Sequence, residues 1–252
     1  MSIVSSIKDA MNGFIKPVRI KRERSAAKLS TWTKIKRTYS FIVTEELEPP
    51  PVKQGKKTLV LDLDETLIHS SKYIAHPDVE SFRVEFDDEE IEQNSNGVPP
   101  KKDYLYVQLR PGVKEFLDYV NSHFDVFIFT YGVQDYADKI IDALCPQIDK
   151  EHRYYRDSCE LRNHGKMVHK DLDIFHRPLT DLILVDDNIS AQKFHPDNSI
   201  QIQQWKGTPN DRVLTEWLMP ILVECESASD VRKIINSHKP ESRHSKRKSA
   251  PI

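Results

Sequence analysis

Short apolar runs separated by helical patterns constrain the fold of this chain more than any other feature of its sequence. Three apolar runs have the length and the β-branched or aromatic residues that are typical of buried strands. They lie at 58–61 (TLVL), 124–129 (FDVFIF) and 182–185 (LILV). Between these runs, residues 113–120 and 133–144 place apolar side chains at helical spacing. Strands that alternate with helices predict βαβ units, so we expect an α/β fold with a mostly parallel central sheet.

Further segments complete this prediction. Strands are expected at 104–109 and 200–202, and helices at 211–223 and 229–235. An insertion at 70–101 contains apolar residues in strict alternation, followed by an acidic stretch rich in Asn, Gly and Pro. This pattern predicts a small β-hairpin with a loose tip. The insertion is too short for a large cap domain, so we expect an open site.

Charge divides the chain into three parts. The net charge is −2, but ten basic and two acidic residues up to Thr44 give the beginning of the chain +8 and leave −10 for the rest. We expect a basic amphipathic arm and Pro-rich linker at 1–54, a folded body at 55–238, and a basic, disordered tail at 239–252.

The N-terminal arm combines apolar residues at helical spacing (3–18) with a basic stretch (16–37). A helix of this kind contacts an anionic membrane surface or an acidic partner. A solvated tail and a mitochondrial transit peptide are the open alternatives. The chain has no run of about 18 apolar residues, so we expect no transmembrane segment.

Glycine and cysteine usage excludes several kinds of active site. With seven glycines, the chain contains neither G-x-x-x-x-G-K-[ST] nor G-x-G-x-x-G, and so no glycine-rich nucleotide loop. Its three cysteines, Cys145, Cys159 and Cys225, form no C-x-x-C pair and are too few for a disulfide framework, which indicates a reducing compartment. None has Arg six positions later, which excludes a thiol phosphatase with a C-x₅-R loop.

Polar side chains suited to one task follow the predicted buried strands. Asp62 and Asp64 follow the first strand, Thr130 the second, and Asp186 and Asp187 the third. The carboxyl ends of parallel strands share one edge of the sheet, where ligands bind. Clustered carboxylates are costly without a cation, and Mg²⁺ prefers oxygen ligands.

The spacing of Asp62 and Asp64 predicts different catalytic roles for the two carboxylates. Asp62 and Asp64 are two residues apart, so in an extended segment their side chains point the same way. One carboxylate can act as nucleophile and the other as general acid and base on a phosphoryl group. Lys170 is a candidate to supply the further positive charge that a phosphoryl group beside these carboxylates requires. Thr130 is a candidate hydrogen-bond donor to a phosphoryl oxygen. A lone D-x-D is a weak signal. The order of an apolar strand with D-x-D-x-T, a strand followed by Thr, a Lys, and a strand followed by Asp-Asp is a stronger one.

These motifs resemble those of the haloacid dehalogenase superfamily and, more narrowly, those of phosphatases acting on the C-terminal domain of RNA polymerase II. The resemblance covers about Gly55 to His238 and implies a Rossmann-like haloacid dehalogenase fold. The basic N-terminal segment, Tyr155-Arg156 and the Asp-Val-Arg at 230–232 are also similar to the Dullard group, which acts on lipin phosphatidate phosphatases at the nuclear envelope and endoplasmic reticulum. The motifs are LVLDLDETLIHSS (59–71), LRPGVKEFL (109–117), FIFTYGVQDYADKIID (127–142), YYRDSCE (154–160), HKDL (169–172), LILVDDN (182–188) and FHPDNSI (194–200).

The resemblance implies roles for the acidic residues. Asp62 is expected to form an aspartyl-phosphate, and Asp64 to protonate the leaving oxygen and then deprotonate water. Mg²⁺ is expected to bind the Asp62 side chain, the Asp64 backbone carbonyl and the Asp187 side chain. The family usually has Asp-Asn where this chain has Asp186-Asp187, a register counted back from His195. The choice of ligand between Asp186 and Asp187 therefore stays open.

The resemblance also implies supporting and substrate-binding residues. Thr130 and Lys170 are expected to hold the phosphoryl group, Asp186 to orient Lys170, and Thr66 to support the loop through hydrogen bonds. Arg156 matches a substrate-contacting Arg. Pocket positions are matched by Tyr136, Val84 and Phe86, although packing within the hairpin is an equal alternative for the last two.

We therefore expect a hydrolase, a magnesium-dependent phosphoprotein Ser/Thr phosphatase, in the nucleus or cytoplasm. Its substrate is the polymerase tail or, alternatively, a lipin-type protein, the latter with peripheral association at the nuclear envelope or endoplasmic reticulum. No direct binding of nucleic acid is expected. A non-catalytic protein similar to the mitochondrial presequence receptor is the competing hypothesis, and the short insertion disfavours a small-molecule phosphatase.

Overall fold

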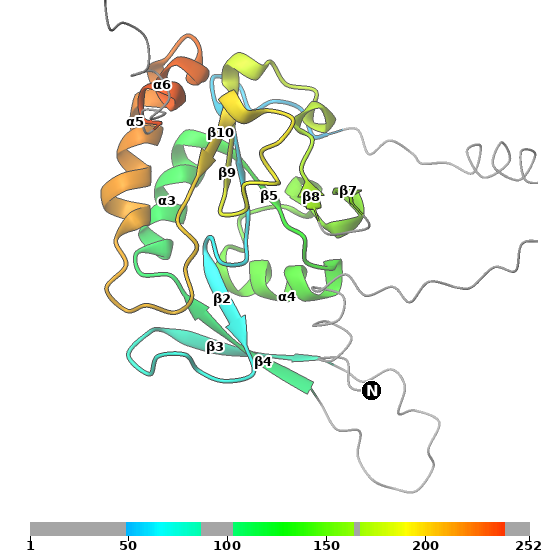
Figure 1. Cartoon of the computed structure of the whole chain (residues 1–252), viewed down its shortest axis with the longest axis vertical. Helices are drawn as coiled ribbons and strands as arrows, with labels where there is room; N and C mark the ends of the chain where they lie inside the picture. The colour runs from blue at the N-terminus through cyan, green and yellow to red at the C-terminus, as the bar shows by residue number, and fades with distance from the viewer. Residues whose placement is uncertain (1–48, 87–102, 164–166, 240–252) are drawn as a thin grey trace, which may run out of the picture.

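The computed structural model describes residues 49–86, 103–163 and 167–239, and its centre is a five-stranded parallel sheet (Figure 1). The predicted N-terminal helix, most of the arm and the C-terminal tail lie outside the described residues. The strand order is β10-β9-β1-β5-β6. The strands are β1 (Lys57–Leu61), β5 (Phe124–Phe129), β6 (Arg153–Tyr154), β9 (Leu182–Asp186) and β10 (Ser199–Gln201). The predicted α/β fold with a parallel central sheet is confirmed.

Burial on both faces explains why the central strands are continuous apolar runs. Strand β1 pairs with β5 on one side and with β9 on the other, and every residue of β5 and β9 is buried. Leu59 and Leu61 belong to a large core cluster to which all the long helices contribute. Val60 points to the opposite face and packs in a smaller cluster with aromatic residues such as Phe127 and Phe175. The alternation of side chains along β1 thus divides the core into two layers.

The helices that cover the larger cluster are α3 (Val113–His123), α4 (Gln134–Leu144), α5 (Met219–Ser227) and α6 (Val231–Ser237). Of these, α3, α4 and α6 begin and end close to their predicted positions. Short 3₁₀ turns are found at Lys150–His152, Arg156–Ser158, Leu172–Phe175, Leu179–Asp181 and Pro196–Asn198. No helix in the described ranges is long and apolar enough to cross a membrane.

The helix expected at 211–223 begins differently from the prediction. Val213–Leu218 forms a π-helix, and α5 follows it with Pro220 in its first turn. Proline has no backbone N–H and its ring clashes with the preceding turn, so a continuous α-helix across this point is unfavourable. The wider turn accommodates that interruption.

The insertion forms a second, antiparallel sheet with the order β2-β4-β3 (Figure 1). Its strands are β2 (Ile68–Ser71), β3 (Ser81–Phe86) and β4 (Asp103–Leu109). The predicted hairpin is present, but its second arm is β4, which we had expected as a separate strand of the body. The tip at 87–102 lies outside the described residues.

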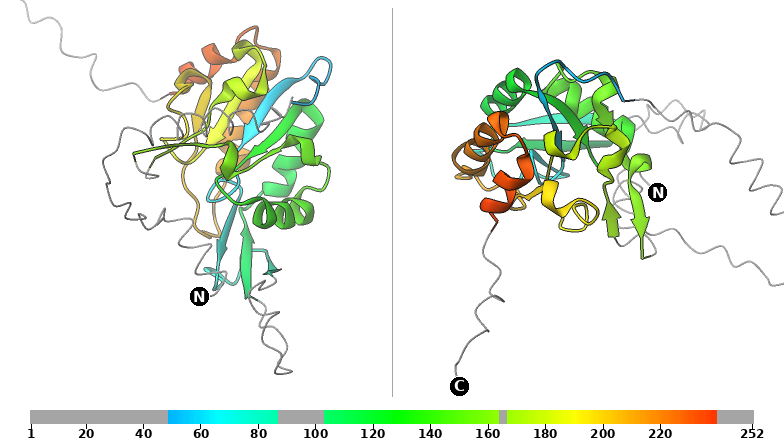
Figure 2. Two further views of the ribbon diagram at one scale, coloured as in Figure 1. Left: turned by 90° about the vertical axis from the view of Figure 1, so that its right-hand side faces the viewer. Right: turned by 90° about the horizontal axis from the view of Figure 1, so that it is seen from above.

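A two-stranded antiparallel ribbon of β7 (Glu160–Arg162) and β8 (Met167–His169) has no counterpart in the prediction. Figure 2 shows it on the side of the molecule opposite α5 and α6. Lys170 follows β8 directly, so this ribbon delivers that side chain to the sheet edge.

The end of the predicted linker contacts the body at the edge of the sheet where the strands begin. The Pro50 carbonyl accepts a hydrogen bond from Arg177, and Lys53 Nζ lies 3.2 Å from the buried Asp125 carboxylate near the start of β5. The linker therefore joins the body at the edge opposite the carboxyl ends of the strands.

Candidate active site

The loop after β1 places Asp62 and Asp64 on the same side of the chain. The Asp62 backbone N–H donates to the Val185 carbonyl at 2.9 Å, which extends the ladder between β1 and β9 by one bond. Leu63, between the two aspartates, is buried in the core, so the aspartates point away from it. Glu65 has a φ of 62°, and this left-handed residue turns the chain sharply toward β2.

Lys170 lies between two buried carboxylates. Its Nζ is 2.7 Å from Asp62 Oδ1 and 2.6 Å from Asp186 Oδ2. Burial alone would lower the pKa of Lys170, but the negative charges of Asp186 and Asp62 outweigh it and hold that pKa above its ordinary value. Lys170 is therefore a fixed positive charge beside the predicted nucleophile.

Asp64 has the properties of a proton donor at neutral pH. Burial raises the pKa of the half-buried Asp64 to about 7; the Tyr136 hydroxyl, which donates to Oδ1, lowers it, and the charge of Asp62 raises it. The Tyr136 oxygen also lies 2.7 Å from Ser70 Oγ. A carboxyl with a pKa near the working pH can both give and take a proton.

Thr130 ends β5 beside Asp64. Its Oγ1 accepts a hydrogen bond from the Gly132 backbone N–H at 2.9 Å and lies 3.5 Å from Asp64 Oδ2. Because Gly132 occupies one lone pair, the hydroxyl hydrogen can point toward the site. The arrangement suits a donor to a bound phosphoryl oxygen.

The residues present fit a divalent cation. Asp62, Asp186 and Asp187 each offer an oxygen within 4.8 Å of the others. Lys170 supplies one positive charge for these three carboxylates. Burial and the charge of Asp62 raise the pKa of Asp187 to about 6, which indicates uncompensated negative charge at this point. Oxygen ligands of this kind suit Mg²⁺.

Asp186 and Asp187 differ in what already binds them. Asp186 accepts hydrogen bonds at both oxygens, from Lys170 at Oδ2 and from the Asn188 backbone N–H at Oδ1 (2.8 Å). Asp187 accepts one from Gln204 Nε2 at Oδ2, 3.1 Å away. This difference favours Asp187 as the residue with an oxygen to offer a metal.

Arg110 is a supporting residue that the sequence did not reveal as such. It is fully buried, donates to both carboxylate oxygens of Asp211 at 2.9 and 3.0 Å, and donates to the carbonyls of Thr66 and Gln203. It thus fastens the catalytic loop to the segment after β10. The only sequence signal is its place in the Leu-Arg-Pro-Gly motif.

Thr66, which is expected to support the loop through hydrogen bonds, does so with its backbone and not with its side chain. Its Oγ1 is buried without a hydrogen-bond partner among the described residues. The support comes through its backbone carbonyl, which accepts from Arg110 Nη1 at 2.9 Å. Side-chain type alone could not indicate this backbone contact.

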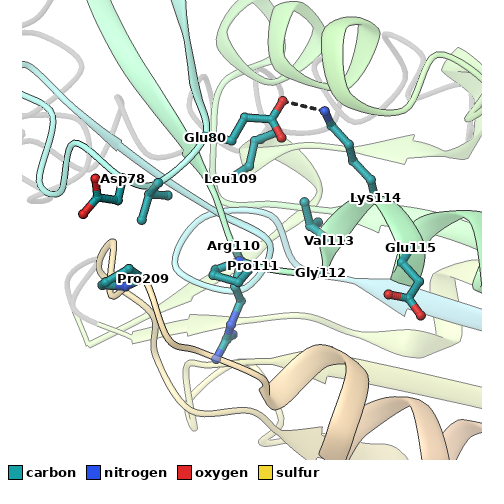
Figure 3. A pocket seen from close by; sticks show the side chains of 11 residues that line it. Asp78, Glu80, Leu109, Arg110, Pro111, Gly112, Val113, Lys114, Glu115 and Pro209 are labelled. Atoms are coloured by element: carbon teal, nitrogen blue, oxygen red, sulfur yellow. Dashed lines mark hydrogen bonds and ion pairs between the residues drawn. The ribbon is translucent and has the colours of Figure 1, made fainter.

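Arg110 also contributes to the wall of a hollow of about 410 Å³ (Figure 3). Its walls include Asp78, Glu80 and Lys114, and Glu80 and Lys114 form an ion pair at 2.5 Å. The Arg110 side chain extends away from the centre of the hollow in this view. None of the predicted catalytic residues lines it.

The predicted substrate-binding residues divide into buried and accessible ones. Tyr136 is 4% exposed and stacks on Phe86, which packs with Val84 in the core, so these side chains support the hairpin. Arg156 is half-buried, donates from Nε to the Tyr131 carbonyl at 2.9 Å, and lines an open pocket together with Cys159, whose Sγ lies 3.8 Å from the Thr130 carbonyl oxygen. The structure thus brings Tyr136 to Asp64 and leaves Arg156 accessible.

Comparison with known proteins identifies the family. The model of the NLI interacting factor-like phosphatase family matches residues 57–232. The chain belongs to this family. This family is one of phosphatases, which confirms the prediction made from the motifs.

Relatives named as phosphatases align with the folded body. Identity is 37% to Phosphatase PSR1 of Saccharomyces cerevisiae, over 73% of this chain and 40% of that protein. The chain is 38% identical to a probable C-terminal domain small phosphatase of Dictyostelium discoideum, over 74% of this chain and 56% of that protein. It is 31% identical to CTD nuclear envelope phosphatase 1B of Danio rerio, over 72% of this chain and 71% of that protein. The chain thus spans about half the length of the first two relatives.

Solved structures give a weaker likeness. The fission yeast RNA polymerase II CTD phosphatase Fcp1-R271A, bound to beryllium fluoride, is 18% identical. The TM-score is 0.45, and the match covers 82% of this chain and 57% of that one.

Proposed function

We propose that this chain is a metal-dependent phosphoprotein phosphatase that hydrolyses phosphoserine or phosphothreonine through an aspartyl-phosphate on Asp62. The observation that carries the proposal is the contact of Lys170 with both Asp62 and Asp186, with Asp64 beside them. Membership in a phosphatase family supports the reaction class.

In the first step, Asp62 attacks phosphorus and the bond from phosphorus to the Ser or Thr oxygen breaks. Asp64, protonated because its pKa is raised to about 7, gives its proton to the leaving oxygen. Lys170 orients Asp62 for the attack, since it donates to Oδ1. Thr130 donates to a phosphoryl oxygen.

In the second step, water attacks the phosphorus of the aspartyl-phosphate. Asp64, now ionised, takes the proton from that water, and the bond from phosphorus to the Asp62 oxygen breaks. Phosphate leaves, Asp62 returns as a carboxylate and Asp64 returns protonated. One residue thus serves as acid and then as base.

Mg²⁺ fits the site as the expected ion. The Asp62 side chain, the Asp64 carbonyl and the Asp187 side chain would hold it, and it would neutralise charge on the phosphoryl oxygens. Asp187 is preferred to Asp186, because both Asp186 oxygens already accept hydrogen bonds.

The accessible side of the site suits a phosphorylated side chain on an extended peptide. Asp64 is half-buried, and Arg156 lines the open pocket to which Cys159 also contributes. The names of the relatives suggest a C-terminal-domain phosphopeptide as substrate and the nucleus or nuclear envelope as location. A polymerase-tail peptide is the first candidate and a lipin-type phosphopeptide the second.

The test is hydrolysis of a phosphopeptide panel by the full chain with and without Mg²⁺. We expect magnesium-dependent phosphate release that is abolished in Asp62→Asn and retained in Asp118→Asn, an exposed aspartate on α3. Equal turnover by Asp62→Asn would contradict the mechanism. Absence of activity toward every phosphoester would favour the non-catalytic binding protein.

A further inference from the structure

Gln204 lies in a short segment that is hydrogen-bonded to Arg110 and to the loop after β1. The Gln203 carbonyl accepts from Arg110 Nη2 at 3.0 Å, and the Trp205 backbone N–H donates to the Glu65 carbonyl at 2.8 Å. Trp205 itself is 1% exposed. The backbone on either side of Gln204 is therefore fixed at a place from which the exposed Gln204 side chain reaches Asp187.

The Gln204 side chain engages one of the two Asp187 oxygens. Its Nε2 donates to Oδ2 at 3.1 Å. Asp187 is a carboxylate, so it has two oxygens that a cation could bind. Gln204 occupies one of them and leaves the other for the ion.

The number of oxygens that Asp187 offers matters for the choice of ion. A carboxylate can bind a cation through one oxygen or through both. Ca²⁺ accepts six to eight oxygens at variable geometry and often takes both oxygens of a carboxylate, whereas Mg²⁺ requires an octahedron of short bonds. A site that offers single oxygens therefore disfavours Ca²⁺ relative to Mg²⁺.

We propose that Gln204 is a positioning residue for metal selectivity: by engaging Asp187 Oδ2, it restricts Asp187 to one coordinating oxygen and favours Mg²⁺ over Ca²⁺. This inference rests on the proposed metal site. It concerns a residue of this chain that does not itself bind the ion or the substrate.

Calorimetric titration of the full chain with Mg²⁺ and with Ca²⁺ tests the inference without reference to activity. The variant is Gln204→Met, which keeps the length of the side chain and removes the donor. The matched control is Gln203→Met, an exposed glutamine whose contact with Arg110 uses only its backbone. We expect the preference for Mg²⁺, measured as the ratio of the two dissociation constants, to fall about fivefold in Gln204→Met and to be unchanged in Gln203→Met.

A second background separates positioning from a general loss of structure. Asn at position 187 has a single oxygen, so Asp187→Asn cannot bind through two. In that background Gln204→Met should leave the ratio of dissociation constants unchanged. Because both constants come from the same variant, a partial loss of folded protein cancels from the ratio.

The outcomes distinguish this inference from the proposed function. If the wild-type chain binds Mg²⁺ and hydrolyses phosphopeptides while Gln204→Met keeps the wild-type ratio, the inference alone is wrong. A fall in the ratio that persists in the Asp187→Asn background also contradicts it. If the wild-type chain binds neither ion, both the metal-dependent function and the inference are wrong.

Discussion

Lys170 Nζ lies 2.7 Å from Asp62 Oδ1, although the two residues are 108 positions apart and both side chains are almost fully buried. The contact joins the loop after β1 to the segment after β8. A buried carboxylate is stable as an anion only with such a partner, so this pair links the fold of the sheet edge to the reactivity of Asp62.

Removing that cation should damage both activity and stability. In Lys170→Met, Asp62 and Asp186 lose their common partner, and we expect turnover to fall by at least about 100-fold and the free energy of unfolding to fall by about 3 kcal/mol. Phosphopeptide hydrolysis and urea denaturation measure the two effects. Lys114→Met is the control, because its pair with Glu80 is exposed and should contribute less than about 1 kcal/mol. Wild-type turnover by Lys170→Met would contradict the assigned role.

The hydroxyl of Tyr136 should matter most for poor leaving groups. Tyr136→Phe keeps the ring that stacks on Phe86 but removes the donor to Asp64. We expect turnover of a phosphoserine peptide to fall about tenfold, with a much smaller loss for an aryl phosphate whose leaving group needs no proton. Tyr104→Phe, at an exposed position of β4, is the matched control. Equal losses on both substrates would show that Tyr136 does not assist Asp64 in protonating the leaving oxygen.

The raised pKa of Asp64 predicts a definite pH dependence of stability in the absence of metal. Between its ordinary value of 3.8 and about 7, folded Asp64 keeps a proton that the unfolded chain has lost. The folded state therefore binds more protons, and the free energy of unfolding should decrease as the pH rises from about 4 to about 7. Denaturation of the wild type and of Asp64→Asn in a chelator should show a smaller decrease in the variant. An identical pH dependence would argue against a raised pKa.

Arg110 should be essential for stability although it touches no substrate. Arg110→Met leaves Asp211 and the Thr66 carbonyl without their partner, and we expect the free energy of unfolding to fall by about 3 kcal/mol. Arg212→Met is the comparison, because its ion pair with Glu216 is exposed and should contribute less than about 1 kcal/mol. Similar stabilities of the two variants, measured in urea, would disprove a special role for Arg110.

The elements that the sequence predicted well are those whose pattern follows from burial. Strands β1, β5 and β9 are covered on both faces, so each is a recognisable apolar run. The sheet to which β4 belongs depends on pairing with β2 and β3, which periodicity does not encode. The ribbon of β7 and β8 is short and partly exposed, so its residues carry little strand signal.

The candidate site shows the same limit. Asp62, Asp64 and Thr130 converge because strand ends meet at one edge of a parallel sheet, which is a rule of topology. Lys170 reaches them from the ribbon of β7 and β8, which the sequence did not predict. The bond from Tyr136 to Asp64 and the backbone contacts of Arg110 depend on distances between segments far apart in the chain. No local pattern of residue types contains them.

The central claim is that Asp62 becomes phosphorylated during turnover. The most direct measurement is acid quenching of the full chain during hydrolysis of a phosphoserine peptide with Mg²⁺, followed by mass spectrometry of the fragment that contains Asp62. The account predicts a phosphoryl group on Asp62 that is absent from Asp62→Asn. Phosphate release by the wild type with no phosphoryl group on Asp62 at any quench time, or with the group on another residue, would contradict it.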